Sequence, residues 1–354
     1  MDTTFSLNVV FISSTHCDFI WEGLQMKKPK IYIALPEKDE NLRLEDRDFL
    51  RTFADVIQHA GDQTPTPEEK RDVCVTVDAM IVGRSGGWLT REIIDSATAL
   101  KAVGVVGGAV GQTEPEYLLD KGVTIINTGW AMSPAVAETT LAMMLNGLRD
   151  FPYMIQRMKE DGWGKARGAL DLTGKAVGLI GFGMIAKRVA ELLQPFRVDL
   201  RVFDPYIDEA VVAQYGGKLV GLDDLMSNSL VVSVHAGLTP ETTGMIGERE
   251  LALLPDRALI VNTARAGVVD EEALVSALQS GRIRAALNVF WKEPLPKDHP
   301  LRDLDNVILT PHGGGLTLDT MRRHSESVVQ DLARFFKGEA VQNVVTREML
   351  GRMT

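Results

Sequence analysis

The sequence has little cysteine and no long apolar run. Cys17 and Cys74 are the only two cysteines among 354 residues, too few for a disulfide framework, and they lack the CxxC spacing of metal or redox sites. No apolar stretch approaches the roughly 18 residues of a membrane span. The N-terminus has no basic segment ahead of an apolar core, so no signal peptide is expected. We therefore expect a cytoplasmic protein without a membrane partner or a metal site.

Positive charge is also scarce. Lysine and arginine number 38 against 48 aspartates and glutamates, which gives a net charge of -10. A nucleic-acid partner would need a basic footprint, so none is expected, although a few local cations could still capture a small anion. At roughly 100–200 residues per domain, the length suggests two domains.

Short apolar runs alternate with amphipathic stretches in two successive series. The first series has apolar runs at 30–35, 79–82, 100–106 and 123–126, with an amphipathic stretch over 44–59. A long helix is expected to follow, with Ser133 as N-cap and Pro134 at the first helical position. Residues 1–27 read as an N-terminal extension in which 9–12 could form a strand or a loose segment.

The second series contains six candidate strands separated by helical stretches. A closing amphipathic helix is expected over 316–336. Six strands with helices between them are what a doubly wound nucleotide-binding domain requires. The candidate strands cover residues 176–180, 200–203, 230–234, 258–261, 285–289 and 307–309.

A glycine-rich turn follows the first of these strands. Residues 181–186 read GFGMIA, of the form GxGxxA, at the end of a strand and the start of a helix. Gly181 would permit the tight turn, Gly183 would let the backbone approach a pyrophosphate, and the small Ala186 would let the helix pack close to the strand. The alternative is that these glycines serve only the turn.

The context of this turn strengthens the case for a dinucleotide. The amides near Met184 and Ile185 would lie at a helix N-terminus and could donate to phosphate oxygens. Asp204 ends the next strand, about 20 residues on, where a carboxylate would bind the ribose 2′-hydroxyl. It would repel a 2′-phosphate, so NAD is favoured over NADP. The alternative role for Asp204 is a helix cap.

Three chemically active residues follow late strands of the second series. Arg265, Glu293 and His312 each stand just beyond an apolar run, and the carboxyl ends of parallel strands line the ligand crevice. Reduction of a 2-oxo acid needs a cation to hold the carboxylate, a proton donor with a pKa near neutrality, and a carboxylate to stabilise the imidazolium. Taken singly, the three could be a solvated arginine, a turn glutamate and a loop histidine.

Several segments together resemble one known family, the D-isomer-specific 2-hydroxyacid dehydrogenases. The resemblance covers roughly residues 75–340 and, more weakly, extends back to about residue 30. It is carried by residues 177–186 with Asp204, 232–235 (VSVH), 238–242 (LTPET), 261–274 (VNTARAGVVDEEAL), 285–295 (AALNVFWKEPL) and 309–315 (LTPHGGG).

The resemblance implies an α/β protein in which a Rossmann-type, doubly wound cofactor domain is inserted into a discontinuous, flavodoxin-like substrate domain. The substrate domain would comprise residues 1–130, with 1–27 uncertain, and 312–354. The NAD-binding domain would span residues 131–311, with hinges near Ala131 and Pro311. Members of this family usually dimerise through their cofactor domains, so a homodimer is expected.

The resemblance also implies a role for each site residue. Arg265 would bind the substrate carboxylate and carbonyl, His312 would be the acid–base, and Glu293 would pair with it. The remaining expected contacts are with substrate at Gly107, Gly108 and Ala109, and with NAD at Gly181, Gly183, Met184, Ile185, Asp204, His235, Thr263, Ala264, Asn288, Gly314 and Gly315.

Some positions depart from the family pattern. Asn288 stands where an aspartate usually meets the nicotinamide carboxamide, and Gly129-Trp130 replace a common Pro-Gly. Glu293 differs from the glutamine of the family's formate dehydrogenases, whose reaction needs no proton shuttle. Two alternatives to an active enzyme stay open. One is a nicotinamide-sensing binding protein like the family's transcriptional corepressors, and the other is a catalytically impaired homologue, which the departures at Asn288 and Gly129-Trp130 suggest.

The substrate is also left open among glyoxylate or hydroxypyruvate, 3-phosphoglycerate, and larger aliphatic or aromatic 2-oxo acids. Arg84 could meet a distal phosphate or carboxylate, or could be a solvated loop residue. Trp88 and Trp130 could form the wall of a pocket for a larger group, or could pack in the core.

Overall fold

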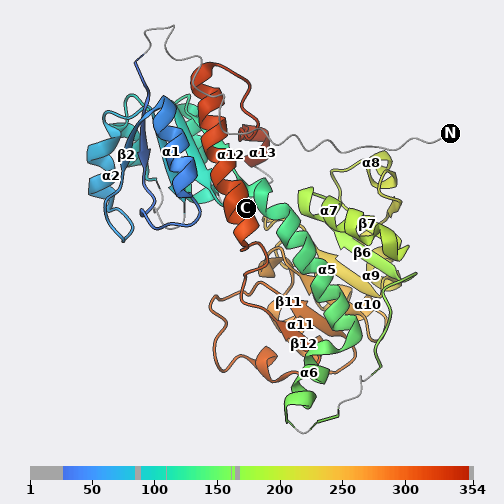
Figure 1. The fold of residues 1–354 in the computed structure, drawn as a ribbon. Helices are drawn as coiled ribbons and strands as arrows, with labels where there is room; N and C mark the ends of the chain where they lie inside the picture. Colours follow the sequence, from blue (N-terminus) through green and yellow to red (C-terminus); the bar gives the residue numbers. More distant parts are fainter. Residues whose placement is uncertain (1–26, 84–88, 109, 161, 164–167, 351–354) are drawn as a thin grey trace, which may run out of the picture.

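The computed structural model describes residues 27–350 except 84–88, 109, 161 and 164–167. The chain forms two lobes, each built on a parallel sheet with helices against it (Figure 1). The expected strand at 9–12, together with Arg84, Trp88 and Ala109, lies outside the described residues.

The first lobe contains a five-stranded parallel sheet of order β2-β1-β3-β4-β5 in the described part of the chain. This is the flavodoxin-like order 2-1-3-4-5, as expected. Its strands are β1 (Lys30–Ile33), β2 (Asp55–Gln58), β3 (Ala79–Gly83), β4 (Ala102–Val106) and β5 (Thr124–Asn127). The intervening helices are α1 (Leu44–Phe53), α2 (Pro67–Cys74), α3 (Arg91–Ser96) and α4 (Pro115–Asp120).

One expectation for this lobe is wrong. The amphipathic stretch expected over 44–59 is two elements, because the chain turns to extended backbone at Ala54 (φ -132°, ψ 154°), where α1 ends. Residues 55–58 then pair in parallel with β1 as an edge strand. The half-exposed Asp-Val-Ile-Gln segment lacks the uniformly apolar character of the other strands. Its sequence therefore looked like a continuation of the amphipathic helix that precedes it.

The second lobe contains a seven-stranded parallel sheet of order β12-β11-β10-β9-β6-β7-β8, again within the described residues. Numbered in chain order from β6 and read from β8 to β12, the sheet has the order 3-2-1-4-5-6-7. This is the doubly wound order 3-2-1-4-5-6 with one strand added. The strands are β6 (Ala176–Ile180), β7 (Asp199–Phe203), β8 (Gly217–Leu219), β9 (Val231–Val234), β10 (Leu259–Asn262), β11 (Arg284–Leu287) and β12 (Val307–Leu309). The expected six strands omitted β8, whose three residues, Gly-Lys-Leu, form no apolar run.

Helices cover this sheet and lead back to the first lobe. They are α5 (Ser133–Arg149), α6 (Phe151–Glu160), α7 (Met184–Leu193), α8 (Glu209–Ala213), α9 (Leu222–Asn228), α10 (Glu248–Leu253), α11 (Glu271–Gln279), α12 (Leu318–Lys337) and α13 (Arg347–Leu350). Ser133 is the first residue of α5 and not its N-cap, which is Met132, and no side chain caps this end. The closing helix starts at 318 and not 316, with Thr317 as its N-cap.

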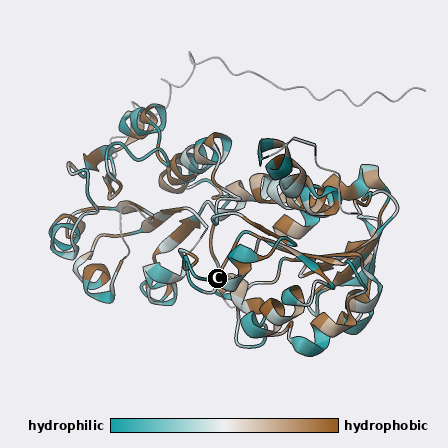
Figure 2. Ribbon diagram, turned by 90° about the horizontal axis from the view of Figure 1, so that it is seen from below, coloured by the Kyte–Doolittle hydropathy of each residue, from teal (hydrophilic) through white to brown (hydrophobic). Residues whose placement is uncertain are grey.

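The placement of α12 connects the end of the chain to its beginning. This helix packs against α1 and β4, and Figure 1 shows it beside the first lobe, next to α1. The strands carry most of the apolar core: β4 is buried throughout, and hydrophobic colour follows the strands in Figure 2 while hydrophilic colour marks the outer helices. Each described helix is too short or too polar to cross a membrane.

Candidate active site

A cleft of about 1020 Å³ lies where the carboxyl ends of strands from both sheets meet. From the first lobe it is lined by residues at or just after the ends of β1, β3 and β4, including Leu35, Gly83 and Gly108. From the second lobe it is lined by the turn after β6 and by segments that follow β9, β10, β11 and β12. Crevices at the carboxyl ends of strands are where open α/β sheets bind ligands.

The glycine-rich turn has the backbone that its sequence predicts. Gly181 has φ +85°, and a Cβ at this position would come within 2.7 Å of the backbone nitrogen of Ala236. Gly183 precedes α7 as its N-cap residue and faces open space where a Cβ would be. Ala186 is fully buried. The turn thus has both the conformation and the room that a dinucleotide pyrophosphate needs.

Asp204 is fixed at the end of β7 by two backbone amides. Its Oδ2 accepts a hydrogen bond from the Phe182 amide at 2.7 Å, and its Oδ1 accepts one from the Tyr206 amide at 2.9 Å. The carboxylate therefore braces the glycine-rich turn directly, a role that the sequence did not reveal. Asp204 is not among the residues that line the cleft, and its contact with a ribose stays a prediction.

His312 and Glu293 form a direct pair at the edge of the cleft. His312 Nδ1 lies 2.7 Å from Glu293 Oε2 and 2.9 Å from Oε1, and the Phe290 amide donates to Oε1 at 3.0 Å. Burial opposes ionisation of Glu293, but the hydrogen bonds from His312 and Phe290 outweigh it and lower the pKa of the carboxyl group. Its carboxylate form is therefore the one that meets the imidazole.

The backbone at His312 is strained. Its φ is +42°, in the left-handed region that residues with a Cβ rarely occupy. Such strain is concentrated at functional sites. The side chains of His312 and Glu293 remain 48% and 39% exposed, so both are open to a ligand in the cleft.

Arg265 enters the cleft from the segment after β10. Its Nη1 donates to the carbonyl oxygen of Ala264 at 2.9 Å. Burial lowers the pKa of Arg265, and the nearby Glu293 carboxylate acts in the opposite direction. The loop is shaped by Asn262, whose Oδ1 accepts from the Ala264 amide at 3.0 Å and whose Nδ2 donates to the carbonyl of Arg265 at 3.0 Å.

Sequence reasoning did not single out Asn262. The available signal was an asparagine at the end of the otherwise apolar strand Leu-Ile-Val-Asn, where the structure buries it to 2% exposure. A buried amide side chain needs hydrogen-bond partners, and the backbone of the Arg265 segment supplies them.

Most of the other expected cofactor contacts gather on the second-lobe side of the cleft. Asn288 donates from Nδ2 to Thr310 Oγ1 at 2.8 Å and accepts at Oδ1 from the Gly314 amide at 3.2 Å, so its amide joins two strand ends. Gly314 itself is buried and is not among the lining residues. The lining includes Met184, Ile185, His235, Thr263, Ala264, Asn288 and Gly315.

One atom in this group is unsatisfied. The Nε2 of His235 is buried without a hydrogen-bond partner in the described structure, and burial lowers the pKa of the ring to about 4. Buried polar atoms are rarely left unpaired. Because His235 itself lines the cleft, its neutral imidazole with an unpaired nitrogen fits a bound polar cofactor.

The expected substrate loop lies on the opposite side. Gly107 and Gly108 line the cleft, and Gly107 has φ +117°. The amide of Gly107 already donates to Thr128 Oγ1 at 3.3 Å. Trp130, which is 37% exposed, and Met132 lie next to the loop on the cleft lining.

The fold and the cleft define a two-lobed α/β protein of the dinucleotide-binding class. The chain belongs to the D-isomer specific 2-hydroxyacid dehydrogenase family, and its residues 141–314 match the NAD binding domain of that family. This confirms the family resemblance of the sequence motifs, the Rossmann-type fold and the nature of the cofactor.

Named relatives support this assignment. A D-3-phosphoglycerate dehydrogenase of Methanocaldococcus jannaschii is 37% identical over 81% of this chain and 56% of its own length. One of Archaeoglobus fulgidus is 33% identical over 75% of this chain and 51% of its own length. The chain thus spans about half the length of these curated relatives. A glyoxylate reductase structure from Paecilomyes thermophila superposes with a TM-score of 0.79 at 25% identity, covering 91% of this chain and all (100%) of that one.

Proposed function

We propose that the protein is an NAD-dependent dehydrogenase that interconverts a 2-oxo acid and the D-isomer of the 2-hydroxy acid. The observation that carries this proposal is the His312–Glu293 pair at 2.7 Å, which shares one cleft with Arg265 and with the glycine-rich turn. A proton carrier, a fixed cation and a dinucleotide site together are the requirements of this reaction.

Each residue of the cleft has a separate part in this chemistry. When bound, NADH supplies the hydride that reaches C2 of the oxo acid. Arg265 binds the carboxylate and polarises the carbonyl oxygen. The imidazolium of His312 gives a proton to the same oxygen as it gains negative charge, and Glu293 stabilises that imidazolium. In the oxidation direction, neutral His312 takes the proton back.

The cofactor would be held by the second lobe. Gly181, Gly183 and the first amides of α7 would receive the pyrophosphate, and Asp204 would bind the ribose and disfavour NADP. The nicotinamide end would meet His235 and Asn288. Thr263, Ala264, Gly314 and Gly315 complete the proposed NAD contacts, and Gly107, Gly108 and Ala109 the proposed carboxylate contacts.

The direct test is NADH oxidation by the purified protein against a panel of 2-oxo acids, with NADPH in parallel. The panel runs from glyoxylate and hydroxypyruvate to 3-phosphohydroxypyruvate and phenylpyruvate. We expect turnover with at least one acid, faster with NADH than with NADPH. Measurable NADH binding without any turnover would contradict the proposal and favour a nicotinamide-sensing protein.

Two variants test the assigned roles. His312→Gln should lower kcat by about 10²-fold or more with little change in NADH affinity, because only the proton carrier is lost. Arg265→Ala should mainly raise KM for the oxo acid and also slow turnover. Near-wild-type rates in both variants would show that these roles are wrong.

We also propose that residues 131–311 form the NAD-binding domain, and that residues 1–130 and 312–354 form the substrate domain. The pairing of strands within two separate sheets and the return of α12 to the first lobe support this division.

The proposed homodimer would form through the second lobe. No residue of α6 is buried, and Phe151, Ile155 and Met158 are 41%, 53% and 54% exposed along one side at helical spacing. A second copy of the chain would cover this apolar face. Light scattering should report a dimer for the wild type and a monomer for Ile155→Glu, with Gln156→Glu as the control. A wild-type monomer would contradict this proposal.

A further inference from the structure

The cleft contains a buried imidazole that takes no part in the proposed proton transfer. His324, on α12, is 3% exposed, and burial lowers the pKa of its ring to about 4. Its Nδ1 lies 2.7 Å from the hydroxyl oxygen of Thr128, a fully buried residue just after β5. The two residues are 196 positions apart in the sequence, so this contact joins the two ends of the substrate lobe.

The Thr128 hydroxyl that contacts His324 is also hydrogen-bonded to the substrate loop. It accepts a hydrogen bond from the amide of Gly107 at 3.3 Å and lies 3.3 Å from the carbonyl oxygen of Val105. If Nδ1 of His324 carries no proton, the Thr128 hydroxyl donates to Nδ1. If Nδ1 is protonated, the ring donates to the hydroxyl oxygen, and the hydroxyl then donates to the carbonyl oxygen of Val105. In both arrangements the hydroxyl accepts the amide of Gly107.

Gly107 and Gly108 need this support because neither has a side chain. Gly107 has φ +117°, and a Cβ at that position would meet nothing within 4 Å, so packing does not fix its conformation. Asn127 supplies a second tie, donating from Nδ2 to the Gly107 carbonyl at 3.0 Å and accepting at Oδ1 from the Gly129 amide at 2.8 Å. The Gly108 amide has no acceptor in the described part of the chain.

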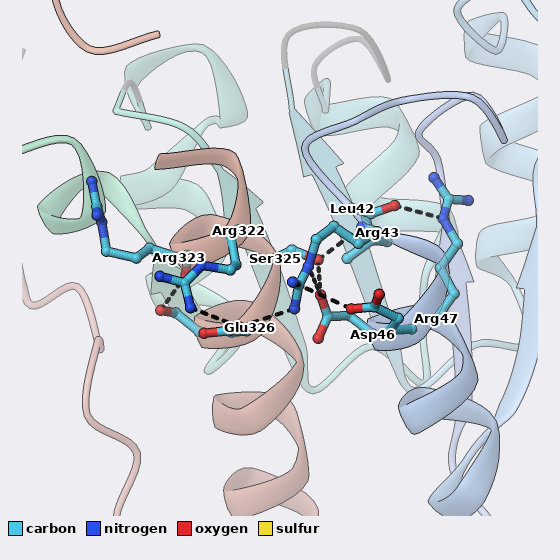
Figure 3. Close-up of polar contacts among 10 residues, drawn as sticks. Leu42, Arg43, Asp46, Arg47, Arg322, Arg323, Ser325 and Glu326 are labelled. Carbon is cyan, nitrogen blue, oxygen red and sulfur yellow. Dashed lines mark hydrogen bonds and ion pairs between the residues drawn. The ribbon is translucent and has the colours of Figure 1, made fainter. Parts of the chain in front are cut away.

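The helix that carries His324 is itself firmly held. On the side facing α1, Ser325 donates to Asp46 at 2.5 Å and accepts from the Arg43 amide at 2.9 Å, while Glu326 pairs with Arg43 at 3.0 Å (Figure 3). Next to His324, Arg323 donates from Nε to the carbonyl of Ala131 at 2.9 Å. The same helix begins six residues after His312, so it is close to both the substrate loop and the acid–base residue.

We propose that His324 is a positioning residue, which acts through the Thr128 hydroxyl to hold the Gly107–Gly108 loop in the conformation that binds the substrate carboxylate. The inference rests on the proposed function in one respect only, namely that this loop receives a carboxylate. Ordering donors before the ligand arrives increases affinity, because less freedom is lost on binding.

Five variants separate this role from a merely structural one. Thr128→Val removes the hydroxyl with little change of shape, and Thr128→Ser retains it. His324→Phe keeps a flat ring without the nitrogen acceptor, and His324→Asn restores an acceptor near the position of Nδ1. Ser325→Ala is the matched control, because it removes a buried hydrogen bond on the same helix that leads to α1 and not to the loop.

Two readouts are needed. The first is KM and kcat for the best 2-oxo acid, and the second is the dissociation constant of oxamate, a non-reducible 2-oxo acid analogue, from the NADH-loaded protein by calorimetry. We expect Thr128→Val and His324→Phe to raise KM and the oxamate dissociation constant about tenfold, the effect of one lost positioning hydrogen bond, with kcat and NADH affinity within about twofold of wild type. Thr128→Ser and His324→Asn should recover most of the affinity, and Ser325→Ala should leave it unchanged.

Three results would overturn the inference. Unchanged oxamate affinity in Thr128→Val and His324→Phe would show that the loop needs no such support. An equal loss in Ser325→Ala would assign the effect to general loosening of α12. Failure of the wild type to bind oxamate would remove the carboxylate role itself, whereas oxamate binding without turnover would refute the proposed redox activity and leave the positioning role standing.

Discussion

The charge of Glu293 should contribute measurably to turnover. Glu293→Gln keeps the shape and an acceptor oxygen but removes the negative charge that faces His312 at 2.7 Å and 2.9 Å. In the oxidation direction His312 becomes cationic as it takes the proton, so the lost attraction acts on the transition state and not on substrate binding. We therefore expect a lower kcat with little change in KM for the hydroxy acid.

The size of the effect follows from the geometry of the pair. A hydrogen bond to a charged group contributes about 1.5–3 kcal/mol. Both side chains are more than one third exposed, so solvent screening favours the lower value, about 1.5 kcal/mol. That corresponds to a roughly tenfold fall in kcat.

The assay is steady-state NADH formation at saturating NAD, across a range of hydroxy-acid concentrations. Glu271→Gln is a matched control, because Glu271 pairs with His299 at 2.9 Å in the same lobe but neither residue lines the cleft. A kcat for Glu293→Gln within about twofold of wild type, or an equal loss in Glu271→Gln, would refute the reasoning.

Three further predictions concern the cofactor turn, cofactor choice and acid stability. Gly181→Ala should destabilise the fold by about 1–3 kcal/mol, because φ is +85° and the new Cβ would meet Ala236, whereas Gly183→Ala should keep its melting temperature and lose NADH affinity; equal melting temperatures with equal NADH affinities would contradict both. Asp204→Ala should raise the ratio of NADPH to NADH kcat/KM by about tenfold or more, and an unchanged ratio would leave the carboxylate only its bracing role. The folded-state pKa of His324 is about 4, below the roughly 6.5 of an unfolded chain, so its contribution to stability is complete above about pH 6.5 and falls by about 1.4 kcal/mol per pH unit towards pH 4. Urea unfolding should therefore show a smaller loss of unfolding free energy on acidification in His324→Phe than in the wild type, and an equal dependence of that free energy on pH in the two proteins would refute this.

The regular part of the fold could be predicted because apolar runs mark buried parallel strands. Apolar runs in the sequence match the uniformly buried strands of four or five residues in both sheets, such as β4 and β9. The elements that were missed, β2 and β8, are at sheet edges and only partly buried. Edge strands gain less from burial, so their residues need not be apolar, and the pattern that reveals a strand is lost.

The candidate site was partly predictable for a similar reason. Arg265, Glu293 and His312 each follow a strand, so the parallel sheet alone predicts that they lie at one edge. The structure adds the 2.7 Å pairing of His312 with Glu293, which depends on loop geometry that the spacing does not specify.

Contacts made by side chains distant in sequence could not be predicted. The hydrogen bond between Thr128 and His324 joins a loop to a helix near the other end of the chain, and neither residue belongs to a motif. Asp204 was singled out for a ribose, but its contact with the Phe182 amide depends on how two βα turns approach each other.

The most direct test of the account is to follow the hydride itself. The wild-type protein would be supplied with NADH that carries deuterium at both C4 positions of the nicotinamide and with the 2-oxo acid that it reduces fastest. The product would be analysed by mass spectrometry and chiral chromatography. The account predicts one deuterium at C2 of a D-2-hydroxy acid, and a loss of this product in His312→Gln. A product without deuterium at C2, or an undiminished yield from His312→Gln, would contradict it.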